Sequence, residues 1–243
     1  MRLVLLFLAA SILCPIHCAP HPEFPKWKGG SASLDIEWRN ASIVAVGEIT
    51  NAASYGVQAV DGLPWPGSVG VEKLYWCEGH FQVTAILKGS PSPTARKYLW
   101  AWPQPGCQLY DRDSTLLGSR YKTRVWFLRE EGGFLRPLYD GGGAPRFVGF
   151  CEAWDDGAPL PPAQRVGVFL LTPWANCAAN SADMADYARY LWSVGDFACL
   201  LLGKQSCIQR LRSLGHSPHA ALRKEACDYL KWQLQTACEE PSR

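Results

Sequence analysis

Ten cysteines spread through a chain of 243 residues constrain this sequence more than any other feature. Cysteine thiols pair and persist as disulfides in oxidising compartments, whereas the cytosol keeps them reduced. The zinc alternative needs closely spaced cysteine pairs, and the sequence holds no Cys-x-x-Cys motif. We therefore predict a disulfide-stabilised protein that is secreted, periplasmic or at the cell surface, with no metal and no cofactor.

The N-terminal stretch agrees with export, because it has the layout of a signal peptide. A positive start is followed by an apolar run over residues 3–13, which Pro15 ends. That run is too short to span a bilayer and suits the core of a signal peptide. We predict a signal peptide over residues 1–18. No later stretch is apolar for long enough to predict a transmembrane segment.

The cleavage site stays open between two positions. Cleavage after Ser11 would use small residues at the recognition positions and would keep Cys14 and Cys18 in the mature chain. Cleavage after Cys18 would remove both cysteines. Either cut leaves an even number of cysteines, as a fully paired set requires.

The charge balance excludes one class of partner. The chain carries 24 basic and 22 acidic residues, a net charge of +2, and the two signs are interspersed. Nucleic-acid-binding proteins concentrate positive charge on one face, and membrane-surface proteins carry polybasic patches. We expect neither nucleic acid nor an anionic membrane as a partner.

The first part of the mature chain has the pattern of short strands. Strand-like stretches lie at 42–50, 81–89, 97–102, 123–130 and 132–143. They are short, rich in β-branched and aromatic residues, and in one case clearly alternating. Several short strands at this spacing predict an all-β barrel or sandwich. Residues 52–77 are rich in glycine and proline, so we predict a long loop between the first two strands.

The sequence changes character after the strand region. Residues 151–182 carry clustered prolines and acids, which predict a connector. Within it, residues 166–171 are apolar and fit either a last strand or a buried lead-in. From Asp183 the apolar residues recur at helical spacing until Gly203, which we expect to break the helix. A short helix then ends near Gly215.

The last helix has a clear start. Ser217 is suited to the N-cap and Pro218 to the first helical position. Its predicted buried stripe consists of Leu222, Ala226, Tyr229 and Leu230. We expect residues 183–239 to form a small α-helical unit braced by disulfides, because so few residues bury too little surface to be stable alone.

Two disulfides in this unit are predicted from helix geometry. In an unbroken helix, Cys227 and Cys238 would lie more than ~16 Å apart, which is too far for a bond. A hairpin that turns near His216 would instead bring Cys207 level with Cys227, and Cys199 level with Cys238. We predict these two nested bridges, each stabilising the unit by ~3 to 4 kcal/mol in the chain-entropy model. The sequence leaves the disulfide partners of four further cysteines open: Cys77, Cys107, Cys151 and Cys177.

Three short motifs in the strand region resemble a known family. They are Val46-Gly47, Leu87-Lys88-Gly89, and Cys107 followed by Gly118 and Tyr121. In this order they are similar to the bacterial, secreted relatives of the netrin-like and tissue-inhibitor-of-metalloproteinases module. The resemblance covers roughly residues 40–150 and implies a five-stranded OB-like β-barrel over residues 19–150. With the helical unit, the fold class is α+β. Residues 222–230 also resemble the closing helix of a single helical-repeat hairpin.

The resemblance also implies a role for the first cysteines. Inhibitors of this family begin at a cysteine whose amine and carbonyl chelate the zinc of the target protease. Such an inhibitory N-terminus would require cleavage directly before Cys18, where His17 is a poor residue for signal peptidase. The alternative is that a surviving cysteine pins the N-terminus to the barrel through Cys107.

No catalytic motif stands out in the sequence. It contains no G-x-S-x-G, no H-E-x-x-H and no P-loop. His216 and His219 lie at a predicted helix start, so a solvated turn explains them better than a metal site. Asp111 and Asp113 are spaced as in calcium loops but lack the glycine and glutamate of an EF-hand.

Aromatic residues are the main candidates for a binding surface. Rings exposed on a barrel face can stack on sugars or on protein side chains, and the alternative is that they are simply core. The candidates are Tyr98, Trp100, Trp102, Trp65 and Trp76. We predict a non-enzymatic binding or interaction module whose ligand is a protein or a carbohydrate. The alternatives are a metalloproteinase inhibitor acting through Cys18 and an exported hydrolase with a site built from loops.

Overall fold

A six-stranded sheet and five helices form this α+β protein, as expected for the fold class. The computed structural model describes residues 34–59, 73–91, 97–102, 106–107, 121–138, 147–178 and 180–238. The strands are β1 (Ile43–Ala59), β2 (Lys73–Lys88), β3 (Lys97–Trp102), β4 (Thr123–Glu131), β5 (Phe134–Pro137) and β6 (Phe147–Phe150). The helices are α1 (Leu34–Asn40), α2 (Pro162–Leu170), α3 (Ser181–Leu202), α4 (Lys204–Gly215) and α5 (Ala220–Trp232).

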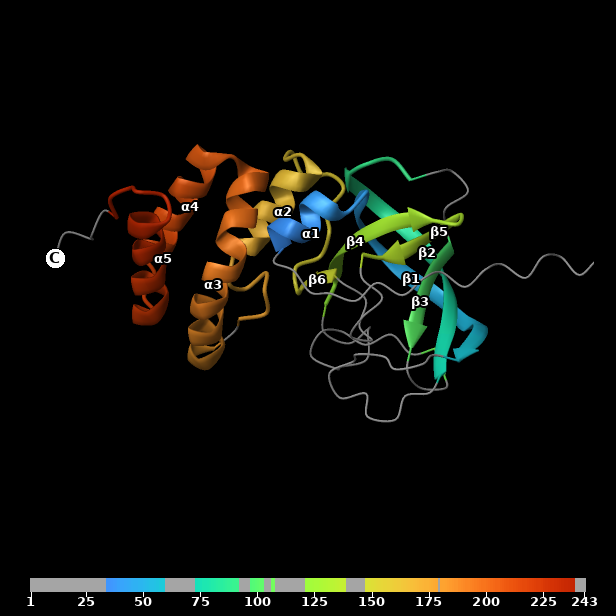
Figure 1. The fold of residues 1–243 in the computed structure, drawn as a ribbon. Helices are drawn as coiled ribbons and strands as arrows, with labels where there is room; N and C mark the ends of the chain where they lie inside the picture. Colours follow the sequence, from blue (N-terminus) through green and yellow to red (C-terminus); the bar gives the residue numbers. More distant parts are fainter. Residues whose placement is uncertain are drawn as a thin grey trace, which may run out of the picture.

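The sheet lies at one end of the molecule and the helices extend away from it, with α5 furthest from the strands (Figure 1). The strands pair in the order β1-β2-β3-β5-β4-β6, and β1 also pairs with β4. Five strands therefore close into a ring, and β6 adds to the ring along β4. The β3–β5 pair is parallel, and the other pairs are antiparallel.

The hairpin of β1 and β2 differs from the sequence prediction. Residues 52–59 and 73–77 belong to strands rather than to a long loop, because β1 and β2 stay paired from Val44↔Lys88 to Ala59↔Lys73. Four register shifts interrupt this pairing, one of them beside Asn51, which has φ 55°. Bulges of this kind break the alternation of apolar and polar residues by which a strand is recognised.

Alternation along β4 divides the apolar core into two layers. Trp126 and Leu128 belong to a cluster that draws on all five strands of the ring, whereas Val125 and Phe127 face the helices. The Trp126 indole donates a hydrogen bond to the Gly47 carbonyl oxygen at 2.7 Å. The helix-facing layer continues into α2, α3, α4 and α5, so one apolar core joins the ring to the helices.

The helices bear out part of the sequence prediction. Gly203 separates α3 from α4, Gly215 ends α4, and the predicted stripe on α5 is buried. The start of α5 is shifted, because His219 rather than Ser217 is the N-cap residue. The strand alternative for residues 166–171 is wrong, since residues 162–170 form α2. Pro161 is the N-cap residue of this helix and Pro162 is its first residue, a position that suits proline. The short helix α1 was not predicted.

Four disulfides join the described cysteines, and two of them correct the predicted pairing. The bridges are Cys77–Cys107, Cys151–Cys177, Cys199–Cys207 and Cys227–Cys238. The nested pairs Cys207–Cys227 and Cys199–Cys238 are therefore wrong. Cys107 bonds to Cys77, so the alternative in which it holds an N-terminal cysteine is also wrong.

The last helix ends at Trp232 and does not continue unbroken to Cys238. After Trp232 the chain turns back, with Gln235 at φ 51° and the Thr236 amide donating to the Leu230 carbonyl oxygen at 2.9 Å. This turn brings the Cys227 and Cys238 α-carbons to 5.1 Å. In the same way, the corner between α3 and α4 brings the α-carbons of Cys199 and Cys207 to 5.0 Å.

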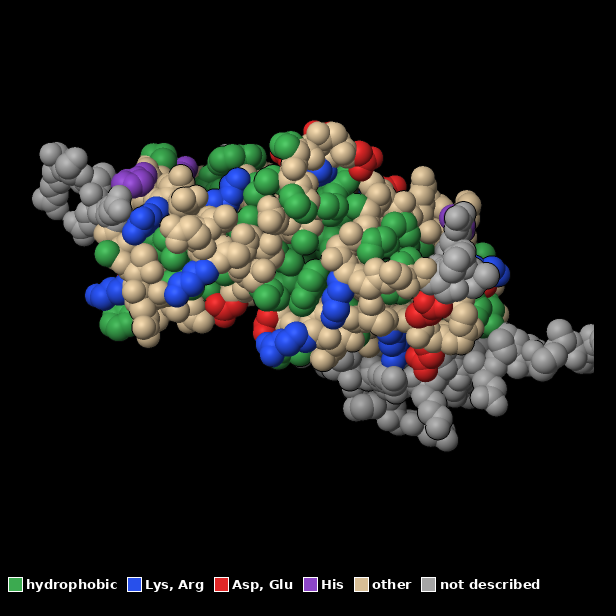
Figure 2. Space-filling model, turned by 90° about the horizontal axis from the view of Figure 1, so that it is seen from above, with side chains coloured by type: hydrophobic (Ala, Val, Ile, Leu, Met, Phe, Trp, Pro, Cys, Tyr) green, Lys and Arg blue, Asp and Glu red, His purple; other side chains and the backbone are tan. Residues whose placement is uncertain are grey.

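The surface seen from above carries acidic and basic side chains in mixture, and hydrophobic side chains gather across its middle (Figure 2). None of the described helices is both long enough and apolar enough to cross a membrane. The predicted signal peptide over residues 1–18 lies outside the described residues.

Candidate functional site

A cleft of about 410 Å³ opens between β6 and the first turns of α3. Aromatic side chains line it from both sides, so we call it the tyrosine cleft. Its walls are Tyr121, Phe147, Val148 and Gly149 on the sheet side, and Asp183, Asp186, Tyr187 and Tyr190 on the helix side. Residues 176–178 form its floor.

The sheet wall owes its shape to the pairing of β6 with β4. Tyr121 precedes β4, and the amide of the next residue donates to the Phe150 carbonyl oxygen at 2.9 Å. The Tyr121 and Phe147 rings meet edge to face, with centroids 6.1 Å apart. Gly149 allows this arrangement, since a β-carbon there would lie 2.4 Å from the Tyr121 ring.

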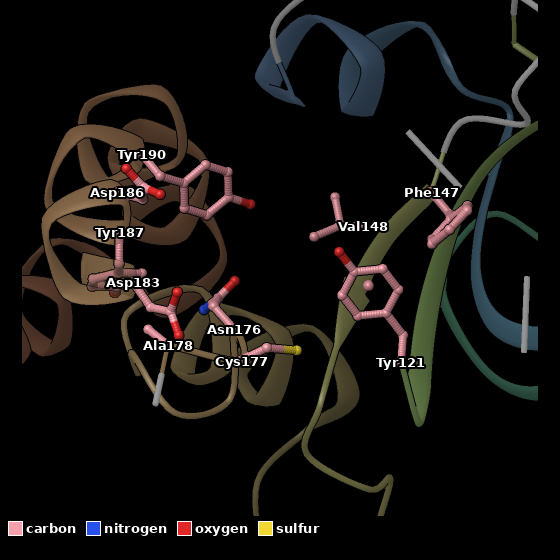
Figure 3. Close-up of a pocket in the computed structure, with 11 residues that line it drawn as sticks. Tyr121, Phe147, Val148, Asn176, Cys177, Ala178, Asp183, Asp186, Tyr187 and Tyr190 are labelled. Carbon is pink, nitrogen blue, oxygen red and sulfur yellow. The ribbon is translucent and has the colours of Figure 1, made fainter. Parts of the chain in front are cut away.

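The helix wall follows from the periodicity of α3. Residues 183, 186, 187 and 190 are three or four apart, so they share one face of the helix. Tyr190 is half-buried, and Figure 3 shows its hydroxyl pointing across the cleft toward Tyr121, whose hydroxyl points back. The cleft therefore has phenol rings on two opposite walls.

The floor is held by covalent and hydrogen bonds. The disulfide Cys151–Cys177 ties it to the end of β6, and the Cys151 amide donates to the Ala175 carbonyl oxygen at 2.7 Å. The Asn176 side-chain amide donates to the carbonyl oxygens of Phe169 and Thr172. A floor fixed in this way keeps the two walls at a set separation before any ligand arrives.

The charged groups of the cleft are carboxylates. Asp183 accepts a hydrogen bond from the Asn180 amide at 2.8 Å, and Asp186 pairs with Arg189 at the exposed rim. Among the lining residues that the structure describes, none is lysine, arginine or histidine. The cleft thus combines negative charge with aromatic faces, the two features that attract a cation.

Tyr187 lies at the back of the cleft and stays neutral. Its hydroxyl donates to the Leu170 carbonyl oxygen at 2.9 Å, and burial together with Tyr190 raises its pKa well above the ordinary tyrosine value. A protonated, hydrogen-bonded phenol of this kind serves as a rigid wall between α2 and α3.

The aromatic residues proposed from the sequence do not form an exposed face. Tyr98 and Trp100 are buried inside the ring, and Trp76 is buried with the Arg136 guanidinium 5.0 Å from its ring centroid. All three side chains are core. Tyr98 and Trp100 face inward, as alternate residues of a closed strand ring do, whereas Trp76 lies in a separate buried cluster with Leu74, Leu99 and Ala101. The side chains of Trp65 and Trp102 lie outside the described residues, as do Asp111 and Asp113.

The remaining candidates from the sequence concern metal and the N-terminus. His216 is the C-cap residue of α4 and His219 is the N-cap residue of α5, so both lie in the turn between these helices. Within the described part of the chain, no cluster of three potential metal ligands occurs. Cys18 lies outside the described residues.

No family model, curated protein or solved structure matches this chain. The geometry of the tyrosine cleft is therefore the main guide to function. The sequence carries one sign of it, the spacing of two acids and two tyrosines on a single helix face. The opposite wall comes from Tyr121 and residues 147–149, which only tertiary packing brings to α3.

Proposed function

We propose that this protein is an exported, non-enzymatic binding module that takes a lysine or arginine side chain of a partner protein into the tyrosine cleft. Four disulfides are compatible with an oxidising compartment. The closed five-strand ring supports an OB-like barrel of the netrin-like kind, a scaffold that serves binding more often than chemistry.

The observation that carries the proposal is the lining of the cleft. Aromatic rings attract cations through their negative faces, by up to about 2 kcal/mol when water is excluded. Asp183 and Asp186 add carboxylate acceptors, whose hydrogen bonds to a cation are roughly twice as strong as neutral ones. A volume of about 410 Å³ is at the small end for ligand pockets and accommodates one long side chain.

The test is an NMR titration of the folded protein with three capped amino-acid amides. N-acetyl-lysine amide is the cationic probe, N-acetyl-norleucine amide is its neutral counterpart, and N-acetyl-glutamate amide is the anionic one. We expect the lysine probe to shift the amide signals of Asp183 and Tyr190, and to bind about tenfold more tightly than the norleucine probe, as a charge-assisted bond predicts.

Variants locate the effect. Asp183→Asn combined with Asp186→Asn should remove the preference for the cationic probe and leave the fold unchanged. Asp228→Asn is the matched control, because this carboxylate pairs with Lys224 on α5 and does not line the cleft. Equal binding of the lysine and norleucine probes, or shifts only at other surfaces, would refute the proposal.

A further inference from the structure

A second hollow, of about 520 Å³, runs between α2 and α4. It shares no lining residue with the tyrosine cleft and does not depend on the function proposed there. We call it the α2–α4 groove. Both helices lie on the upper side of the molecule in Figure 1, the side from which Figure 2 shows hydrophobic side chains gathered.

The walls of the α2–α4 groove are apolar and partly open to solvent. Leu160, Val168 and Trp174 come from α2 and its flanking segments, and Trp174 is 67% exposed. Leu202 and Leu214 form the opposite wall and are buried. A large indole left in water beside an apolar strip is typical of a surface that binds a partner.

One positive charge stands in this apolar groove. Arg210 of α4 is half-buried, and within the described part of the chain no hydrogen bond or ion pair reaches its guanidinium. No aspartate or glutamate is among the described lining residues. Burial lowers the pKa of Arg210 by removing water from its guanidinium, and no acidic partner for this charge lies among the described lining residues. A bound carboxylate would supply that partner through two parallel hydrogen bonds.

The polar rim of the groove narrows the choice of anion. Gln164 of α2 and Ser206, Gln209 and Ser213 of α4 lie beside the apolar strip. Their amides and hydroxyls can both donate and accept, so they match the backbone of a peptide. The hydrocarbon chain of a fatty acid cannot form hydrogen bonds with these side chains.

We propose that the α2–α4 groove docks the carboxyl terminus of a peptide chain whose last residues are apolar. The terminal carboxylate accepts hydrogen bonds from the Arg210 guanidinium. The last apolar side chains pack between Val168 and Trp174, and the rim pairs with the peptide backbone. Carboxylate recognition provides the specificity, and burial of apolar surface provides most of the affinity.

Fluorescence anisotropy with the full chain tests this docking. The first probe is a fluorescein-labelled hexapeptide that ends in two leucines with a free carboxylate, and the second is the same peptide with a terminal carboxamide. We expect the carboxylate peptide to bind at least about tenfold more tightly, because the carboxamide has no charge for Arg210 to pair with. Equal affinities of the two peptides would overturn the proposal without any variant being needed.

Three variants assign the effect to the groove. Arg210→Gln should abolish the preference for the carboxylate peptide, whereas Lys204→Gln removes the same charge from α4 outside the groove and should preserve it. Trp174→Ala should weaken the binding of both peptides equally and leave the ratio of their affinities unchanged. If Lys204→Gln reduced the preference as much as Arg210→Gln, general electrostatic attraction would explain the binding and the proposal would fail. If decanoate bound in the groove and neither peptide did, the proposal would also fail.

Discussion

The Tyr229 hydroxyl of α5 donates a hydrogen bond to the Asp196 carboxylate of α3, and the Tyr229 ring lies against Gly195. Trp192 adds a ring contact to Tyr229 from the preceding turn of α3, with centroids 5.2 Å apart. This cluster is the point at which α5 is held to α3. Its two halves, a close approach and a partly buried hydrogen bond, can be tested separately.

Gly195→Ala should destabilise the protein by about 1–3 kcal/mol, the usual cost of overpacking. A β-carbon at position 195 would lie 2.5 Å from the Tyr229 ring, so the ring would have to leave its place between the helices. Urea unfolding followed by circular dichroism measures the loss. Ser193→Ala, at an exposed position of the same helix, is the control and should change stability by less than about 0.5 kcal/mol. A stable Gly195→Ala variant would show that α5 moves freely against α3.

Stability should decline in alkali through two tyrosines. Burial raises the pKa of both Tyr187 and Tyr229 above the ordinary value near 10, and Asp196 adds to the effect at Tyr229. The unfolded chain therefore loses these protons at lower pH than the folded chain does. Their contribution is complete below pH ~10 and is lost as the pH rises above it.

Thermal unfolding between about pH 8 and pH 11 checks this expectation. Tm should fall above pH ~10. The fall should be shallower in a variant that combines Tyr187→Phe with Tyr229→Phe, even though this variant starts from a lower Tm. An identical slope in the variant and the wild type would mean that other groups cause the alkaline loss.

Local features of this fold were predictable from the sequence, and features set by distant contacts were not. The stripe on α5 and the break at Gly203 depend on neighbouring residues and were predicted correctly. The turn after Trp232 carries no glycine or proline, and a non-glycine residue, Gln235, adopts the positive φ. The local sequence therefore does not predict the turn that pairs Cys227 with Cys238.

The tyrosine cleft shows the same limit. The helix wall could be read from the spacing of Asp183 and Tyr190, but the opposite wall depends on the register of β6 against β4. Four of the five aromatic candidates from the sequence, Tyr98, Trp100, Trp102 and Trp76, lie on strands, and in a closed ring strand side chains alternate between the inside and the outside. Tyr98 and Trp100 point inward, so these two rings belong to the core and not to a binding surface.

Tryptic mass spectrometry of the non-reduced protein should recover two specific linked peptides in the helical unit. Cleavage after Lys204, Arg210, Lys224 and Lys231 places its four cysteines in four different peptides. We expect the peptide 190–204 linked to 205–210, and 225–231 linked to 232–243. A link between 205–210 and 225–231 would instead restore the nested pairing. Replacing both Cys227 and Cys238 by serine should cost about 3 kcal/mol in the chain-entropy model.

Trp126→Phe should destabilise the ring by about 2–4 kcal/mol. The Trp126 side chain is fully buried, and its indole satisfies the Gly47 carbonyl oxygen at 2.7 Å. The substitution removes this hydrogen bond and leaves a void, and both effects oppose folding. Trp232→Phe is the control, because Trp232 is 66% exposed and should change stability very little. A loss below about 0.5 kcal/mol for Trp126→Phe would show that the ring interior repacks easily.

Arg189→Gln should strengthen binding of the lysine probe to the tyrosine cleft. Arg189 pairs with Asp186 at the rim, so it competes with any cation that approaches this carboxylate. Exposed ion pairs contribute about 0–1 kcal/mol, and removing the competitor should therefore tighten binding by no more than about fivefold. The gain should disappear near 1 M salt, where the Debye length falls to about 3 Å. The neutral norleucine probe should bind Arg189→Gln and the wild type equally. Tighter binding of both probes would instead mean that the Arg189 side chain obstructs the cleft mouth and that its charge is irrelevant.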